Sequence, residues 1–89
     1  MKKKLVLAEE LRIANARAAF EALEAAGARK SIDIDASRVA KVDAAGLQAL
    51  AAATLRLRAR GAAWSWHAPS EALTRAARLA GLEGILGLP

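Results

Sequence analysis

The sequence contains no cysteine and no tyrosine, and it has one phenylalanine and two prolines. Without cysteine, the chain cannot form a disulfide bond or a zinc site built on thiolates. Aromatic residues make up 3% of the chain, whereas hydrophobic residues make up 55%, and alanine supplies much of that share. The core therefore has to be built from small side chains that let the layers of the fold pack closely.

Long hydrophobic runs are also absent. No run approaches the roughly 18–20 apolar residues that a membrane span needs, and the Met1–Lys4 segment is followed by an apolar stretch too short for a secretory signal. We therefore expect a cytoplasmic protein without membrane insertion. Because 89 residues suffice for one compact domain but not for two, we expect a single domain over residues 1–89.

Residues that carry catalysis are scarce. His67 is the only histidine, no serine stands in a strand–turn–helix elbow, and no glycine-rich phosphate loop is present. Asp33 and Asp35 share one face of an expected strand, and we interpret them as its solvated side rather than as a catalytic pair. The sequence therefore predicts a protein that is not an enzyme and that uses no metal and no cofactor.

The chain is basic, with a formal net charge of +5 and a pI near 10.5, which keeps a nucleic-acid-binding protein open as an alternative. The basic residues of that alternative are Arg56, Arg60, Arg75 and Arg78. The arginines are scattered over every expected element, however, and Trp64 and Trp66 are expected to fill the core rather than to stack on bases. Nucleic-acid binding is therefore the less favoured interpretation.

Periodicity divides the chain into alternating strands and helices. We expect short strands over residues 5–7 and 11–13, which form a small hairpin if they pair. A helix follows that is capped by Asn15 and ends at Gly27. The later expected elements are a strand over 31–35, a turn over 36–42, a helix over 45–60, a strand over 62–67, a helix that begins after the cap Ser70 and ends at Gly81, and an apolar tail over 82–88 that folds back on the core.

This alternation predicts an α/β fold in which one mixed sheet of about four strands has helices packed against it. In the last helix, we expect Leu73, Ala76, Ala77 and Leu79 to face inward.

The joint between the 36–42 segment and the following helix has an unusual composition. Asp43 is placed to cap that helix, because an acidic side chain there accepts from free backbone amides and is stabilised by the helix dipole. Gly46 costs roughly 1 kcal/mol relative to alanine inside a helix, so another backbone must approach it closely. That backbone belongs either to a neighbouring strand or to a partner protein, and the sequence leaves both open.

The segment DASRVAKVDAAGLQALAAA, residues 35–53, resembles the signature of the STAS domain, the fold of bacterial anti-sigma factor antagonists. The family pattern is Asp-apolar-Ser, about five residues, and then an apolar residue before Asp-Ser/Thr-Ser/Ala-Gly-Leu. Residues 35–37 and 42–47 match it in type and spacing, except at Ala44. The order of elements is also similar over nearly the whole chain.

The resemblance implies a STAS-like single domain that works by binding another protein. In the family, a partner kinase phosphorylates the hydroxyl directly after the aspartate, and the added charge blocks docking. That position is Ala44 here, so the usual phosphorylation site is absent. The implied partner-binding residues are Ser37, Asp43, Ala44, Ala45, Gly46, Leu47 and Gln48.

The resemblance leaves several partners open. STAS domains bind anti-sigma factors and their kinases, act as the small accessory subunit on the ATPase of Mla-like phospholipid-transport ABC systems, or serve chemotaxis-like pathways, and a homodimer also stays open. For the site itself, we expect that Asp43→Lys, or a bulky residue in place of Gly46, would abolish partner binding without unfolding the domain.

Overall fold

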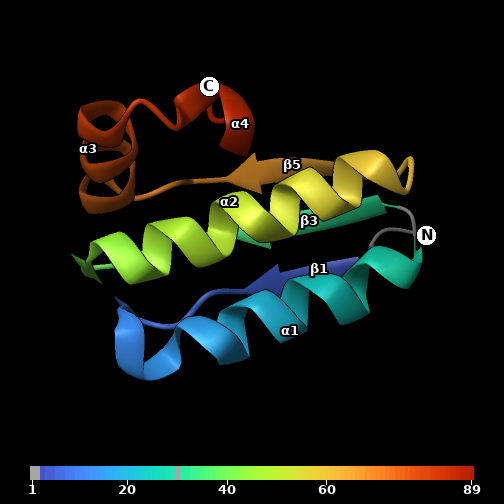
Figure 1. Cartoon of the computed structure of the whole chain (residues 1–89), viewed down its shortest axis with the longest axis horizontal. Helices are drawn as coiled ribbons and strands as arrows, with labels where there is room; N and C mark the ends of the chain where they lie inside the picture. Colours follow the sequence, from blue (N-terminus) through green and yellow to red (C-terminus); the bar gives the residue numbers. More distant parts are fainter. Residues whose placement is uncertain (1–2, 30) are drawn as a thin grey trace.

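A computed structural model describes residues 3–29 and 31–89. Its main sheet contains β1 (Lys3–Val6), β3 (Ser31–Asp35) and β5 (Ala63–His67), which are parallel and lie in the order β1-β3-β5 (Figure 1). A separate parallel pair is formed by β2 (Glu10–Leu11) and β4 (Lys41–Val42). The central strand is thus the one that the alternating segment Ser31–Asp35 predicts.

The predicted α/β fold is confirmed, but the sheet differs in detail from the expected one of four mixed strands. The described strands form three parallel strands and a separate parallel pair. The small hairpin considered for the N-terminal segment is wrong, because β1 pairs with β3 whereas β2 pairs with β4. The carbonyl of Glu9 accepts from the amides of Ala40 and Lys41 at 2.8 and 3.2 Å, which holds the chain after β1 against a distant segment.

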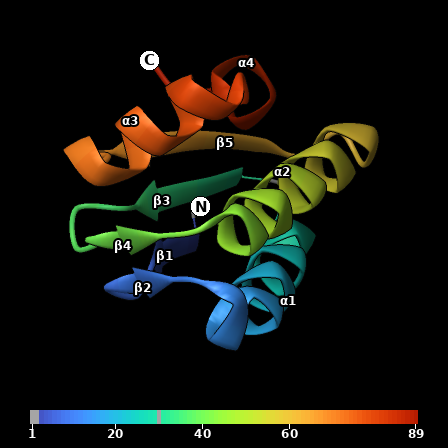
Figure 2. The same ribbon diagram turned by 60° about the vertical axis from the view of Figure 1, so that its left-hand side comes forward.

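Two long helices cover one face of the sheet (Figure 2). They are α1 (Ala16–Ala26) and α2 (Ala44–Ala59), and α2 ends close to the predicted stop at Gly61. The spacing of apolar residues predicts an inward stripe on α2 that Ala53 and Leu55 widen. Leu55 is 49% exposed, so its inward assignment is wrong, whereas the other members are buried: Leu47, Leu50, Ala51, Ala53, Thr54 and Leu57. The remaining helical elements are η1 (Ile13–Asn15), η2 (Gly27–Arg29), α3 (Glu71–Ala80) and α4 (Glu83–Leu86).

The helix ends show which capping signals operate. Ser70 caps α3 as predicted, with its hydroxyl accepting from the amide of Leu73 at 3.1 Å. Asn15 stands at the N-cap of α1 but makes no cap bond there. Its Oδ1 accepts from the amide of Arg12 at 2.8 Å instead, so the side chain closes the short turn η1.

The inner face of the sheet carries the strand residues of the core. Ile32 and Ile34 are fully buried, and the register places Trp64 and Trp66 beside them on the same face. Both indole N–H groups donate to the carbonyl of Leu86, at 2.7 and 2.8 Å. The tail therefore folds back on the core as predicted, with α4 held over β5 by two bonds to one oxygen.

One inward assignment in α3 is wrong. Leu73 and Ala77 are buried, but Leu79 is 84% exposed. Residues two positions apart on a helix point about 200° apart, so a side chain at 79 turns away from the surface that buries residue 77.

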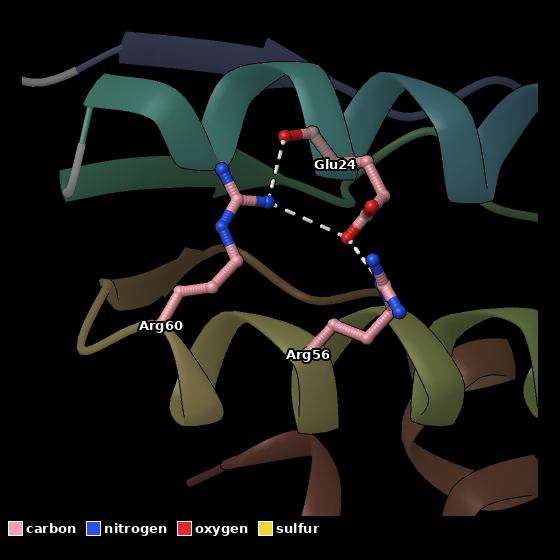
Figure 3. A network of polar contacts seen from close by, with 3 residues as sticks. All are labelled: Glu24, Arg56 and Arg60. Carbon is pink, nitrogen blue, oxygen red and sulfur yellow. Dashed lines mark hydrogen bonds and ion pairs between the residues drawn. The ribbon is translucent and has the colours of Figure 1, made fainter.

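The two long helices are also joined by charge (Figure 3). Arg56 Nε donates to Oε1 of Glu24 at 2.8 Å, and Arg60 Nη1 reaches the same oxygen at 3.5 Å and the Glu24 carbonyl at 3.3 Å. The hydrogen bond from Arg56 lowers the pKa of Glu24 below its ordinary value. This network fixes the C-terminal part of α1 against the last turns of α2.

The outer face of the sheet carries a different set of side chains. The register aligns Lys4, Asp33 and Ser65 in one row and Val6, Asp35 and His67 in the next. All six are exposed or only partly buried. His67, at the end of β5, is exposed. Within the described residues, no helix combines the length and the hydropathy needed to cross a membrane.

Candidate functional site

The corner between β4 and α2 is organised by Asp43. Its Oδ1 accepts from the amide of Gly46 at 2.8 Å, which confirms the predicted cap of α2. Its Oδ2 accepts from the amide of Ile13 at 3.0 Å, and its own amide donates to the carbonyl of Leu11 at 3.1 Å. A single side chain therefore holds the start of α2 against the turn that precedes α1.

Both backbone bonds act on the charge of this carboxylate. The amides of Gly46 and, second, of Ile13 hold the pKa of Asp43 below its ordinary value of 3.8. The side chain thus stays ionised at neutral pH, with both of its oxygens engaged by the chain's own backbone. Its direct role in this structure is to shape the corner.

Gly46 is buried, and a Cβ at this position would overlap the carbonyl of Leu11. The close approach that the glycine predicts is therefore made by β2 of the same chain. Of the two alternatives, the neighbouring strand is correct. A bulky residue at Gly46 would force β2 to move, so we expect this substitution to destabilise the domain as well as to alter the corner.

The predicted partner-binding residues fall into two groups by exposure. Ser37, Ala44 and Gln48 are exposed and Ala45 and Asp43 are partly exposed, whereas Gly46 and Leu47 are buried. The residues of the first group therefore form the solvent-accessible surface of the corner. The buried pair acts beneath it, with Leu47 in the core and Gly46 against β2.

Ser37 lies in a turn at the end of β3. Its amide and its hydroxyl both donate to Oδ1 of Asp35, at 2.9 and 2.7 Å, and these two bonds lower the pKa of Asp35. The hydroxyl of Thr54 donates to the carbonyls of Leu50 and Ala51, at 3.0 and 3.1 Å. Both hydroxyl groups therefore donate to acceptors of the chain itself.

Ile13 was missed as a surface residue of this corner. Its side chain is 77% exposed, and its amide is bound to Asp43. The sequence placed it in a strand after Leu11, so its position became visible only once η1 was known to turn there. The available signal in the sequence was an isoleucine two residues before the cap candidate Asn15.

A shallow hollow of about 260 Å³ lies between the start of α1 and α2. It is lined by Ala16, Arg17, Phe20 and Ala49. The hollow adds a half-buried aromatic side chain and a cation to the exposed alanines of the corner. Within the described residues, no group of three or more His, Asp or Glu side chains is arranged to hold a metal ion.

Comparisons with known proteins show what the chain is similar to. The family model described as "Mlab, STAS domain" matches residues 2–87. Among solved structures, the one titled "NMR Structure of the protein TM1081" is similar with a TM-score of 0.74 and 21% identity, over 93% of this chain and 69% of that one. At this identity the likeness concerns the fold. No curated protein matches the chain.

Proposed function

Because the chain belongs to the STAS domain family, whose model matches residues 2–87, we propose that it is a non-enzymatic protein-interaction module of bacterial signalling or regulation. The observation that carries the proposal is the corner at Asp43, where a capped helix start presents small, uncharged side chains to the outside. Such a surface lets another polypeptide approach the backbone of α2 closely. The proposed location is the cytoplasm.

The proposed docking surface contains Ser37, Ala44, Ala45 and Gln48, with Asp43 as the residue that shapes it. Gly46 and Leu47 support it from below. Ala44 is the first residue of α2 and is exposed. Since alanine carries no hydroxyl, no kinase can add a phosphate at this position. We therefore propose that this module stays competent for its partner without the family's usual switch.

Three kinds of partner fit this proposal. An anti-sigma factor or its kinase is the partner implied by the family's general role. The description "Mlab" of the matching family model favours the second, the ATPase of a phospholipid-transport ABC system, on which the chain would be the small accessory subunit. Both are proteins that would bind at the same corner, and a chemotaxis-like signalling protein is a third of the same kind.

Capture from the native host separates these partners. The tagged chain is used as bait, and the proteins that it retains are identified by mass spectrometry. An ABC ATPase among them supports the transport role, whereas an anti-sigma factor supports the regulatory one. In either case, the captured protein must be lost when the corner is altered, or the docking surface is misplaced.

The substitution Ala44→Asp tests the corner directly. An acid in the first turn of a helix is favourable by about 0.3–1 kcal/mol, so the variant keeps or gains stability. The new charge imitates a phosphate and should weaken partner binding at least about tenfold, by roughly 1.4 kcal/mol. Binding is measured by titration with the captured partner.

Ala44→Asn is the matched control, since it adds nearly the same volume without charge. It should weaken binding less than Ala44→Asp does. Ala25→Asp adds the same charge to an exposed position near the C-terminal end of α1, away from the corner, and should leave binding unchanged. Equal affinity of the unaltered chain and the Ala44→Asp variant would remove this corner from the docking surface.

A further inference from the structure

β1 is an edge strand of the main sheet, beside α1 (Figure 1). The amide of Leu7 donates to the carbonyl of Asp35 at 2.9 Å, which shows that the backbone groups of Leu7 point toward β3. Backbone groups alternate along a strand, so those of Lys4 and Val6 point away from the sheet. An outer row of donors and acceptors is thus left for another strand.

An apolar groove runs along this edge. Its volume is about 210 Å³, more than the roughly 150 Å³ of an apolar cavity that accepts a benzene molecule. A branched aliphatic side chain is therefore small enough to enter it. The groove is lined by Leu5, Val6, Leu7, Ala8, Glu10, Leu11, Asn15, Ala18, Ala19 and Ala22.

The two sides of an added strand would meet different surfaces. Side chains aligned with Leu5 face the helix layer and the methyl groups of α1 that line the groove. Side chains aligned with Lys4 and Val6 face the outer surface of the sheet. Val6 is itself 47% exposed there, so this side offers an alkyl group next to a cation.

The positive charge along the outer edge of β1 determines which kind of segment can bind there. β1 begins with Lys3 and Lys4, both exposed, and among the described residues neither has an ion-pair partner within 4.0 Å. An acidic side chain opposite Lys4 would form a favourable cross-strand pair, whereas a basic one would be repelled. A second copy of the chain would bring another pair of lysines to this edge.

We propose that the outer edge of β1 is a second interaction surface, which takes an extended segment of a partner protein that alternates apolar and acidic residues. The apolar side chains enter the groove beside α1, and the acidic ones lie opposite Lys4 on the outer face. The segment hydrogen-bonds to the outward groups of Lys4 and Val6 and extends the sheet by one strand. This surface shares no exposed residue with the proposed docking surface at Asp43 and does not depend on its role.

The test uses a synthetic peptide that alternates valine and glutamate, with amide hydrogen exchange as the measurement. At a concentration ten times its dissociation constant, the peptide should slow exchange of the Val6 amide by about tenfold, since that amide is protected only in the complex. A peptide that alternates valine and lysine should bind more weakly by at least about tenfold.

Val6→Pro removes the outward N–H and leaves the bonds of β1 to β3 in place, because proline is tolerated on an edge strand when its nitrogen faces outward. It should abolish peptide binding, whereas Val6→Thr, which keeps the N–H and the branched shape, should retain it. Lys4→Glu leaves the backbone unchanged and should reverse the preference between the two peptides. It keeps the test decisive if the proline variant fails to fold.

Three outcomes would overturn the proposal. The first is an unchanged exchange rate at Val6 with the valine–glutamate peptide present. The second is equal binding of both peptides to the unaltered chain and to Lys4→Glu. The third is concentration-dependent protection of the Val6 amide without any peptide, which would identify a second copy of the chain as the occupant of this edge.

Discussion

Asp43 binds the backbone amide of Ile13, which is 30 residues away in sequence, and that of Gly46, which is three residues away. Its capping role follows from the sequence alone, because an acid before a helix is a familiar signal. The bond to Ile13 does not follow from it, since nothing near Ile13 in sequence indicates where the other carboxylate oxygen will lie. Asp43 therefore caps α2 locally and also links two segments that are distant in sequence.

Asp43→Asn should lower stability and change its dependence on pH. An amide side chain has one acceptor oxygen, so one of the two backbone N–H groups loses its partner. Since the folded-state pKa of Asp43 lies below 3.8, its contribution is complete above that pH and is lost as the pH falls through the folded pKa. Thermal unfolding of both proteins between about pH 2 and 7 measures the difference.

The unaltered protein should therefore lose part of its advantage over Asp43→Asn as the solution becomes acidic. The two thermal midpoints should be furthest apart near neutral pH, by several degrees, and should converge below the folded pKa. A carbon NMR titration checks the premise independently. A midpoint at or above 3.8 for Asp43 would contradict it.

At the scale of elements, the contact between β2 and α2 depends on Gly46. β2 and β4 are only two residues long each. Segments this short show no periodicity, so the sequence analysis placed residues 36–42 in a turn. The glycine in α2 was the indirect signal of their presence, because β2 needs the space that a side chain would occupy.

Gly46→Ala should destabilise the domain, although alanine favours a helix by about 1 kcal/mol over glycine. The new methyl group would overlap the Leu11 carbonyl, and forcing β2 away should cost more than that gain, with a net loss of about 1–3 kcal/mol. Urea unfolding followed by tryptophan fluorescence measures it. This outcome differs in sign from the one that helix propensity alone predicts.

Gly84→Ala provides the matched control in α4. A Cβ at Gly84 would meet no atom within 4 Å, so only the helix preference changes and stability should stay equal or rise slightly. If Gly46→Ala is also neutral or stabilising, then β2 yields without cost and the tight contact has no structural importance.

Across the whole molecule, much of the positive charge behind the net charge of +5 is paired with carboxylates, so less of it can bind a phosphate backbone than the composition indicates. Each of the four arginines considered for nucleic-acid binding contacts a carboxylate. Arg56 and Arg60 share Glu24, Arg75 Nη2 lies 2.8 Å from Glu71, and Arg78 Nε lies 3.4 Å from Glu83. These exposed pairs add little stability individually, but they neutralise the cations that a phosphate backbone would need.

We therefore expect no specific binding to DNA or RNA at about 0.15 M salt, where non-specific binding is typically weaker than about 1 µM. A gel-shift titration at several salt concentrations measures this directly. Glu24→Gln, which releases Arg56 and Arg60, should strengthen any residual binding at low salt. Tight, salt-sensitive binding by the unaltered chain would instead favour the nucleic-acid alternative.

Elements with local sequence patterns could be predicted before the fold was known. Alternation in Ser31–Asp35 predicted the central strand, the apolar stripe of α2 predicted its buried face, and the Asp43 and Ser70 caps predicted where two helices begin. Each of these features depends on neighbours within a few residues, so periodicity and capping chemistry suffice to identify it.

The pairing of the strands, the segment that approaches Gly46 and the exposure of the docking corner depend instead on how the chain packs in three dimensions. β1 pairs with β3 instead of with β2, Ile13 lies beside Asp43, and Gly46 and Leu47 are buried beneath Ala44. These outcomes join segments about 30 residues apart, and no local pattern encodes a contact of that length. They result from packing the whole chain around one core.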